Sequence, residues 1–572
     1  MTTDDDATES FAQRNAVPHP LEVELVRVAA AQFATGPDVQ ANLATVLRMV
    51  DDAADTGAEL VVLPEFCNHP SWYSDASHAW EVALDLDGSF LKAVADKAAD
   101  RRVWVMVNAT VRREGDRITD TNVLLDDAGA IRGTSDKQVL MGGERAHISE
   151  GTEHSPIVET PFGPVGLYSC MDGVIFETPR MLAVRGARLL LNSLNSFALD
   201  EASLHVPVRA AENKVWVVAA NKVGYLIPDG VREHVAGQLG IDQDWLQGAG
   251  ESQIVAPDGT VVALAPRYGE AVITADIDVA LAGDKARPDG TDVMAMRRPS
   301  VYAPLASAPR GVTQQPGPVE ALVAVATRAE DVVGAVQQGA RLVVLPELAQ
   351  TADGVTDDPG ALADAADDFL EGLRCDATVV TTVVRRRGQG YAHVAVAVTA
   401  RGVHEQAALH RSARHPWATE LADEVAVVES EVGRLALLVG DDALYPEAVR
   451  LAAIAEAEVV ALPFTVLEEW ELRTGLVERA AENRVNLVAS SRVTAAGQGA
   501  VIAAQPDFTL WTPWERAFDG TINYPLVSTA PRDGGSLVAS VHPAATANRF
   551  VSRGTDVVDG RPWRLASVLA EQ

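Results

Sequence analysis

The chain repeats itself, and this repetition constrains the fold more than any other feature. The run Leu-Val-Val-Leu-Pro-Glu at 60–65 recurs letter for letter at 342–347, and Arg-Ala-Ala-Glu-Asn occurs at both 209–213 and 479–483. Shared runs in the same order along 572 residues predict two copies of one folding unit. A chain of this length is also too long for one compact domain.

Each copy alternates apolar runs with alanine-rich stretches, which predicts α/β layers. The stretches 41–54 and 361–373 are the clearest predicted helices. A Pro/Gly-rich segment separates the copies and is interpreted as a linker. The predicted organisation is a disordered tail (1–21), a first domain (22–303), the linker (304–318) and a second domain (319–572).

Charge and composition exclude several classes of partner. The net charge of −33 argues against binding to nucleic acid or to anionic membranes. No apolar stretch reaches the ~18–20 residues that a membrane span needs. The first twenty residues carry Asp4-Asp5-Asp6 and do not resemble a secretory signal. Three cysteines, at 67, 170 and 375, have no disulfide or metal-site spacing, so we expect a cytoplasmic protein.

Cys170 is the strongest candidate for a nucleophile. It ends an apolar run, Val-Gly-Leu-Tyr-Ser at 165–169, and precedes a helix-like stretch that starts near Glu177. At a strand-to-helix turn the unpaired amides of the helix end can lower the pKa of a thiol and can bind an oxyanion. Buried cysteines are more often inert, so this feature needs support from other residues.

Three other segments carry residues that complement a thiol. Glu65 follows an all-apolar strand, where a purely structural glutamate is unusual, and Lys137 and Glu144 flank a glycine turn. The Arg-Ala-Ala-Glu-Asn segment at 209–213 is interpreted as opening the strand at 215–221. Each piece alone is weak, but their order along the chain is specific.

These four segments resemble the nitrilase (carbon–nitrogen hydrolase) superfamily, over about residues 26–302. The resemblance implies a four-layer α-β-β-α sandwich for each copy. It implies a catalytic triad of Glu65, Lys137 and Cys170, joined by Glu144, with the backbone amide of Met171 in the oxyanion site. Glutamate would act as general base and acid, the thiolate as nucleophile and the ammonium as oxyanion stabiliser. No metal and no organic cofactor is expected.

The residues after the nucleophile bear on the substrate. Cys-Met-Asp-Gly at 170–173 is closer to the Cys-x-Asp-Gly of amidase branches than to the Cys-Trp-Glu of true nitrilases. The family's proline before the next glutamate is Phe176 here. We expect hydrolysis of a small amide or an N-carbamoyl compound, with release of ammonia or amine. The alternative is a nitrilase that converts a nitrile to acid and ammonia.

The second copy is predicted to be a pseudoenzyme. With an offset of 270 (479 − 209), Cys170 corresponds to Gly440, and the lysine region at 407–412 contains no lysine. We expect the space beside Gly440 to be closed or to lack convergent charges. Superfamily members generally pair two sandwiches, so the two copies should form an intramolecular pseudo-dimer through a broad apolar interface, with further homo-oligomers open.

Other roles remain open for the second copy and for the whole chain. The second copy could instead hold a regulatory ligand. A non-catalytic scaffold would not explain why Lys137, Glu144 and Cys170 occur together in the first copy. A glutaminase that feeds a synthetase would need an ATP-binding domain, and no glycine-rich phosphate loop is present.

Overall fold

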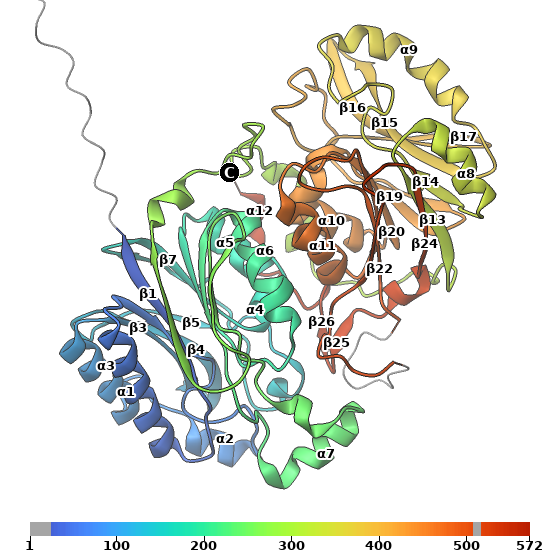
Figure 1. The fold of residues 1–572 in the computed structure, drawn as a ribbon. Coiled ribbons are helices and arrows are strands. Elements are labelled where there is room, and N and C mark those ends of the chain that lie inside the picture. The colour runs from blue at the N-terminus through green and yellow to red at the C-terminus, as the bar shows by residue number, and fades with distance from the viewer. Residues whose placement is uncertain (1–24, 507–515, 572) are drawn as a thin grey trace, which may run out of the picture.

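The computed structural model describes residues 25–506 and 516–571, which form two α/β sandwiches (Figure 1). The predicted tail at 1–21 lies outside the described residues. In both copies two sheets pack face to face and carry helices on their outer faces, so the predicted four-layer α-β-β-α architecture is confirmed.

The first copy contains two six-stranded sheets. One sheet has the spatial order β12 (Ala271–Ile277), β1 (Val26–Gln32), β2 (Leu60–Val62), β3 (Trp104–Arg113), β4 (Arg117–Leu125) and β5 (Ile131–Asp136). The other has the order β11 (Val261–Leu264), β10 (Gln253–Val255), β9 (Trp216–Ala220), β8 (Leu189–Ser193), β7 (Gly163–Ser169) and β6 (Ile157–Thr160).

The second copy repeats both strand orders. Its first sheet runs β24 (Ser536–Val541), β13 (Ala321–Ala326), β14 (Leu342–Val344), β15 (Thr378–Arg387), β16 (Gly390–Thr399) and β17 (Gly402–Ala407). Its second runs β23 (Leu526–Thr529), β22 (Ala500–Ala503), β21 (Asn486–Ser491), β20 (Val459–Phe464), β19 (Gly433–Leu437) and β18 (Val427–Ser430). A short hairpin, β25 (Phe550–Ser552) and β26 (Thr555–Asp556), follows.

The helices cover the sheets from both sides. The first copy has α1 (Val39–Asp55), α2 (Ala76–Val82), α3 (Ser89–Arg101), α4 (Met171–Val174), α5 (Glu177–Val184), α6 (Val206–Asn213) and α7 (Asp229–Leu239). The second has α8 (Val332–Gln337), α9 (Pro359–Gly372), α10 (Pro446–Ile454), α11 (Leu476–Asn483) and α12 (Ser567–Ala570). Two of these, α1 and α9, confirm the helices predicted at 41–54 and 361–373.

The apolar side chains of the strands explain why two sheets pair. In the first copy, strand residues such as Val28, Val62 and Leu191 are fully buried between the sheets. Alternate residues, for example Ala29 and Val61, face α1 and α3 on the outside. Strands that are buried on both faces read as continuous apolar runs, which is the pattern found in the sequence.

One local prediction was wrong. The segment 209–213 was expected to open a strand, but it is the last part of helix α6. Alanine, arginine and glutamate favour helix, and the chain turns toward β9 only at Lys214, which has a left-handed φ of 47°. The buried position of these polar residues comes from the interface between the two copies.

The two copies pack through α5 and α6 against α10 and α11, in the centre of Figure 1. Arg180 pairs with Glu447 and Arg450 pairs with Glu177, both at 2.9 Å between guanidinium Nε and a carboxylate oxygen. The two pairs exchange residues that are 270 positions apart, as a pseudo-two-fold axis requires. The predicted intramolecular pseudo-dimer is therefore present.

The interface is less apolar than predicted. A hydrophobic cluster does span both copies and includes Phe176, Tyr302 and Val449. At its centre, however, Arg209 donates to Glu478 and Glu482, and Arg479 donates to Glu212 and Glu482, with all five side chains buried. Buried ion pairs of this kind confer specificity of pairing more than stability.

Each copy also has a segment that forms hydrogen bonds with the other copy, at 290–293 in the first and 554–557 in the second. Thr555 Oγ1 of the second copy accepts from Gly142 N and donates to Leu140 O, both at 2.9 Å. In the reverse direction Thr291 Oγ1 accepts from Ala413 N at 2.9 Å. The two threonines belong to the repeated Gly-Thr-Asp-Val runs, so the repeat explains both contacts.

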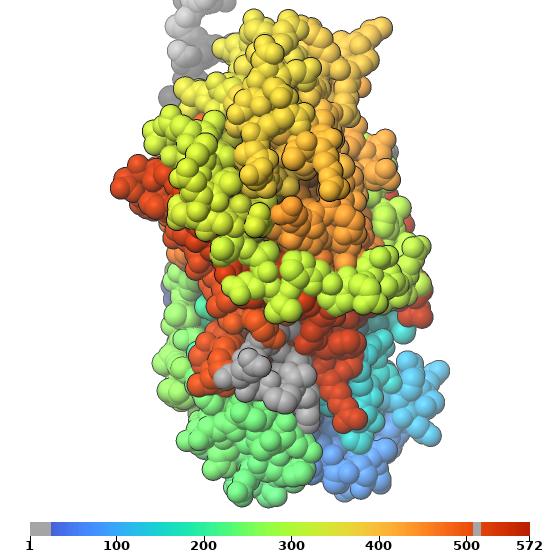
Figure 2. Space-filling model, turned by 90° about the vertical axis from the view of Figure 1, so that its right-hand side faces the viewer, coloured from blue at the N-terminus to red at the C-terminus, as the bar shows by residue number. Residues whose placement is uncertain are grey.

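The segment between the copies lies along the surface of the second copy. It is the yellow-green band across the middle of Figure 2. The amides of Thr313 and Gln314 donate to the carboxylate of Glu456, and Gly317 N donates to Glu458 Oε1 at 2.6 Å. These contacts hold it in place.

Candidate active site

Cys170 lies at a sharp turn between β7 and α4. Its φ is 41° and its ψ is −105°, a backbone conformation that costs a non-glycine residue about 1–3 kcal/mol. The turn is held because Cys170 N donates to Ser193 O at 2.9 Å and Gly173 N donates to Cys170 O at 2.7 Å. The strain presents the thiol at the end of the sheet, as nucleophile turns of hydrolases do.

Lys137 follows directly after β5 and is completely buried. Its Nζ lies 2.7 Å from Glu65 Oε1 and 2.9 Å from each carboxylate oxygen of Glu144. Burial by itself lowers the pKa of Lys137, but Glu144 and Glu65 outweigh it and raise that pKa well above the ordinary value. The ammonium is therefore charged at any physiological pH.

A third carboxyl group, Asp120 on β4, lies behind the lysine with Oδ2 3.8 Å from Lys137 Nζ. Burial, and then the charge of Glu65, raise the pKa of Asp120 well above its ordinary value. Glu65 Oε2 and Asp120 Oδ2 are both buried without another partner. A protonated Asp120 that donates to Glu65 accounts for both oxygens and leaves two carboxylates, those of Glu65 and Glu144, around one ammonium.

The surroundings of Cys170 disfavour the thiolate form. Burial, and then the charge of Glu65, raise the pKa of Cys170 well above its ordinary value. Glu201, in the π-helical turn Glu201–His205, lies near it, with Oε1 4.0 Å from Cys170 Sγ. Burial raises the pKa of Glu201 to about 7. A reaction at Cys170 consequently needs a base to remove the thiol proton.

A small cavity of about 80 Å³ opens onto Cys170 and is lined by residues of both copies. Glu144 and Met171 line it on the side of the first copy, and Ile522, Asn523 and Val551 line it on the side of the second. Asn523 is only 4% exposed, and both of its amide atoms lack a partner among the described residues. Buried polar groups normally have hydrogen-bond partners, so the amide of Asn523 has bonding capacity for water or for a polar group that enters the cavity.

Asp200 and Thr555 hold the second copy at this cavity. Asp200 Oδ2 accepts from Ile522 N at 3.1 Å and from Asn523 N at 2.7 Å. The residues that Thr555 contacts, Leu140 and Gly142, lie in the loop between Lys137 and Glu144. The carboxylate of Glu144 also accepts a hydrogen bond from Met141 N in this loop, at 2.8 Å. The loop that carries Glu144 is thus supported from the second copy.

The structure brings the predicted residues together. Glu65, Lys137 and Glu144 form one buried cluster, and Glu144, Cys170 and Met171 line one cavity. The sequence analysis missed Asp120, Glu201 and Asn523. Asp120 could have been found as a charged residue inside an otherwise uncharged run, Ile-Thr-Asp-Thr-Asn-Val-Leu-Leu at 118–125. Asn523 has no local signal, because only the packing of the copies places it.

Hydrogen bonds identify the equivalent positions in the second copy. Asp172 accepts from Gln138 N and Val139 N, just as Asp442 accepts from Leu409 N and His410 N. The alignment that follows places Ala408 at the position of Lys137. Gly440 takes the position of Cys170, and its φ of 52° keeps the turn without strain.

The space beside Gly440 is closed, because a Cβ atom there would lie 2.9 Å from Glu347 Oε2. Charges nevertheless converge on it: Glu347 pairs with Arg414 at 2.5 Å and with His415 at 3.3 Å. Loss of the thiol and the ammonium therefore left a charged cluster rather than an apolar filling, which the sequence comparison did not show.

Comparison with known proteins identifies the first copy. Residues 27–287 match the carbon–nitrogen hydrolase family, so this half of the chain belongs to the nitrilase superfamily. It is 28% identical over 262 residues to a nitrilase of Pyrococcus abyssi, covering 46% of this chain and 92% of that protein. It is 29% identical over 301 residues to the deaminated glutathione amidase of Homo sapiens, covering 49% and 85%.

Among solved structures, an amidase from Nesterenkonia sp. is 24% identical and aligns over 45% of this chain and 92% of its own, with a TM-score of 0.39.

Within residues 25–506 and 516–571, none of the helices combines the length and the apolar character that a membrane crossing requires. The family assignment supports a carbon–nitrogen hydrolase that acts on a small molecule.

Proposed function

We propose that the protein hydrolyses a small amide or N-carbamoyl compound through a covalent acyl-enzyme on Cys170. The observation that carries this proposal is the buried ammonium of Lys137 between Glu65 and Glu144, behind a cavity that Cys170 lines. In this proposal residues 22–303 form the catalytic domain, 304–318 the linker, and 319–572 a degenerate domain without catalysis of its own.

In the first step Glu65 takes the thiol proton, and Cys170 Sγ forms a bond to the carbonyl carbon. The carbonyl oxygen becomes an oxyanion, stabilised by Lys137 and by the backbone amide of Met171. The C–N bond then breaks, and Glu65 donates its proton to the leaving nitrogen. The products of this half-reaction are ammonia or an amine and a thioester on Cys170.

In the second step water attacks the thioester, and Glu65 accepts a proton from that water while Glu144 orients it. The C–S bond breaks, the acid leaves, and Cys170 regains its proton. Because the surroundings of Cys170 disfavour the thiolate, removal of the thiol proton belongs to the reaction itself. This explains why a buried carboxylate, rather than a helix end alone, has to lie beside the cysteine.

The cavity favours a small substrate. Its volume of about 80 Å³ admits only a few non-hydrogen atoms beyond the reacting group unless the walls move. Met141, Val174 and Phe197 give it apolar walls, while Asn195 and Asn523 offer amide groups. We propose that Asn523, from the degenerate domain, binds a polar group of the substrate.

Ammonia release from a panel of small amides, N-carbamoyl compounds and nitriles tests the reaction class. Hydrolysis of amides or carbamoyl compounds, with a mass increase on Cys170 that matches the acyl group, is the expected result. Glu65→Gln and Lys137→Ala should each lower kcat by about 10²-fold or more. Lys92→Ala, an exposed lysine on α3, is the matched control and should change nothing.

Turnover of nitriles alone would replace the amidase proposal by the nitrilase alternative. No turnover of any compound, together with no adduct on Cys170, would favour a non-catalytic role. Asn523→Leu should raise KM with little change in kcat, since it removes a binding contact and leaves the reacting groups in place.

A further inference from the structure

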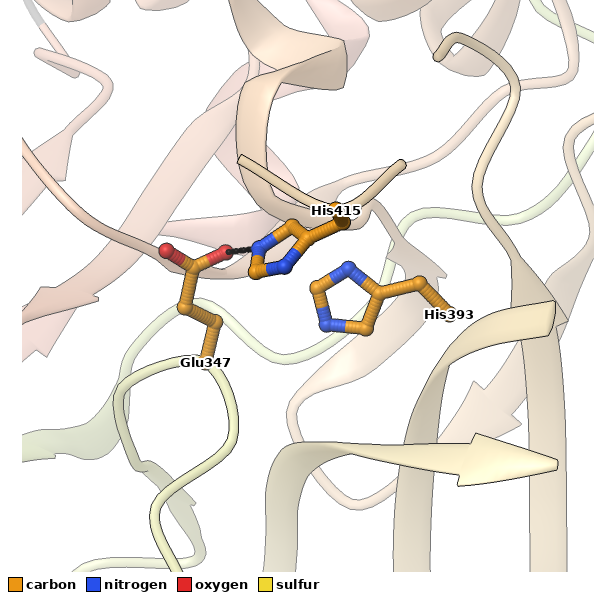
Figure 3. Close-up of side chains that lie close together, drawn as sticks. All are labelled: Glu347, His393 and His415. Carbon is orange, nitrogen blue, oxygen red and sulfur yellow. Dashed lines mark hydrogen bonds and ion pairs between the residues drawn. The ribbon is translucent and has the colours of Figure 1, made fainter. Parts of the chain in front are cut away.

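The cluster beside Gly440 contains three side chains of the kinds that bind transition metals. Glu347 follows β14, His393 lies on β16, and His415 lies in the loop after β17 (Figure 3). One ligand atom from each lies within 4.8 Å of the other two. Their exposed fractions are 0%, 3% and 3%, so no bulk water competes for these atoms.

The three residues occupy the positions that surround the lysine ammonium in the first copy. Glu347 corresponds to Glu65 in the repeated Leu-Val-Val-Leu-Pro-Glu run. His393 corresponds to Asp120, because Ala408 N donates to His393 O at 2.9 Å as Lys137 N donates to Asp120 O at 2.8 Å.

His415 corresponds to Glu144 because the register is continuous across the loop. Gly151 N donates to Lys137 O at 2.7 Å, and Ala422 N donates to Ala408 O at 3.0 Å. The donor and acceptor residues are fourteen positions apart in both copies (151 − 137 and 422 − 408). Glu144 lies seven positions after Lys137 (144 − 137), and His415 lies seven positions after Ala408 (415 − 408).

The geometry points to a divalent metal site formed by Glu347, His393 and His415, in which a bound ion takes the place of the ammonium lost with the lysine. Two imidazoles and one carboxylate are a ligand set for Zn²⁺ and for Fe²⁺, which leave further positions for water. His393 and His415 replace the carboxyl groups of Asp120 and Glu144. Carboxylates suit an ammonium, whereas imidazoles are ligands for a transition-metal ion.

Neighbouring groups fix the proposed ligands in the way that metal sites require. Thr382 Oγ1 lies 2.7 Å from His393 Nε2 and orients that ring, while Arg414 binds Glu347 Oε1 and His415 Nε2 lies 3.3 Å from Glu347 Oε2. Hydrogen bonds of this kind orient metal ligands.

Two further observations bear on the fit. Nδ1 of His415 is buried and has no partner among the described residues, so the ring offers a nitrogen that the protein itself does not use. Ligand atoms about 2.1 Å from one ion lie at most ~4.2 Å apart, and the three ligand atoms here lie within 4.8 Å of one another. The guanidinium of Arg414 opposes a cation here, and its ion pair with Glu347 is the competing arrangement.

Zinc binding to the full chain, after removal of metals with a chelator, tests the site. We expect one Zn²⁺ per chain by elemental analysis after dialysis, and a Tm that rises with added Zn²⁺, since a ligand that binds only the folded state stabilises it. His393→Ala/His415→Ala should abolish both effects. His404→Ala, an exposed histidine on β17 of the same copy, is the matched control and should retain them.

Binding of Co²⁺ gives a second readout that does not depend on any hydrolase activity. The visible absorption of the bound ion should change in Glu347→Gln, a nearly isosteric variant that is used if the double variant does not fold by circular dichroism. Absence of Zn²⁺ from the wild-type chain would overturn the proposal. Stoichiometric binding that survives loss of both histidines, or a Co²⁺ spectrum unchanged in Glu347→Gln, would also overturn it.

Discussion

The two copies share one fold and one register but neutralise a buried glutamate in different ways. In the first copy Glu65 lies against the ammonium of Lys137, and the neighbouring Cys170 has a strained, positive φ. In the second copy Glu347 lies against Arg414 and His415, and the same turn is made by Gly440. The first copy has a costly backbone conformation at a residue with a side chain, whereas the second has a glycine there, for which this conformation is not strained.

The comparison also explains why the second copy persists. It supplies Asn523 to the cavity at Cys170 and Thr555 to the loop that carries Glu144. The copies therefore differ in their charged clusters, but residues of the second copy complete the cavity at Cys170 in the first.

The largest expected difference concerns Cys170 and a cysteine of the second copy, Cys375, which does not occupy the nucleophile position. Cys170→Ala should lower kcat by about 10⁴-fold or more, because only this thiol can form the acyl-enzyme. Cys375→Ala in the second copy should leave kcat unchanged, as measured by ammonia release from the best substrate of the panel. Substantial activity in Cys170→Ala would show that the chemistry lies elsewhere.

The central ion pairs should matter equally from both sides. Arg209→Met leaves the carboxylates of Glu478 and Glu482 buried without this partner, and should lower the free energy of unfolding by about 3–5 kcal/mol. Arg479→Met should have a similar effect in denaturant titrations if the pseudo-symmetry holds energetically. Arg27→Met, which breaks an ion pair whose side chains are 44% exposed, is the control and should cost far less than either change. A large effect from only one of the two buried arginines would contradict an energetically symmetric interface.

The pH dependence of stability should have opposite signs at two buried carboxyl groups, Glu201 of the first copy and Glu447 of the second. Burial raises the pKa of Glu201 to about 7, so its neutral form is favoured in the folded state. The corresponding stability is present below the unfolded pKa of ~4.3 and is lost as pH rises through 7. Glu447 shows the opposite behaviour, because Arg180 and Arg297 lower its pKa to about 2 despite its burial. The contribution of the Glu447 carboxylate to stability is therefore present above the unfolded pKa of ~4.3 and is lost as the pH falls toward 2.

Titration of Glu201 should lower the free energy of unfolding of the wild type by about 2–3 kcal/mol between pH 4.5 and 8. Glu201→Gln should abolish this decrease, as measured by urea unfolding at several pH values. Glu233→Gln, a change to an exposed residue on α7 of the same copy, is the control and should leave the pH profile as it is. An unchanged profile in Glu201→Gln would show that this carboxyl group titrates normally.

The smallest expected effect concerns the backbone at the two turns. Gly440→Ala places a Cβ at a φ of 52° and 2.9 Å from Glu347 Oε2, and should lower the free energy of unfolding by about 1–3 kcal/mol. Cys170→Ala keeps a Cβ where one already exists and should cost less than about 1 kcal/mol. Equal costs at the two positions would show that the turns are not equivalent.

Much of this protein was determined by its sequence alone. The repeated runs predicted two copies of one fold, because the same residues in the same order bury the same faces. The predicted residues Glu65, Lys137, Glu144 and Cys170 could be named because each follows an apolar strand or a glycine turn, and such local signals survive without knowledge of packing. The absence of a lysine in 407–412 likewise needed only the alignment of the two copies.

Tertiary structure decided the features that depend on contacts between distant segments. Why the charges of Arg209 and Glu212 are buried depended on the partner helix α11 of the other copy. Asn523 lines the cavity only because Asp200 binds its backbone from more than three hundred residues away. His393 and His415 lie twenty-two positions apart (415 − 393), and the fold brings both to Glu347. Sequence reports local propensity and order, whereas the geometry of a site is set by the packing of strands and copies.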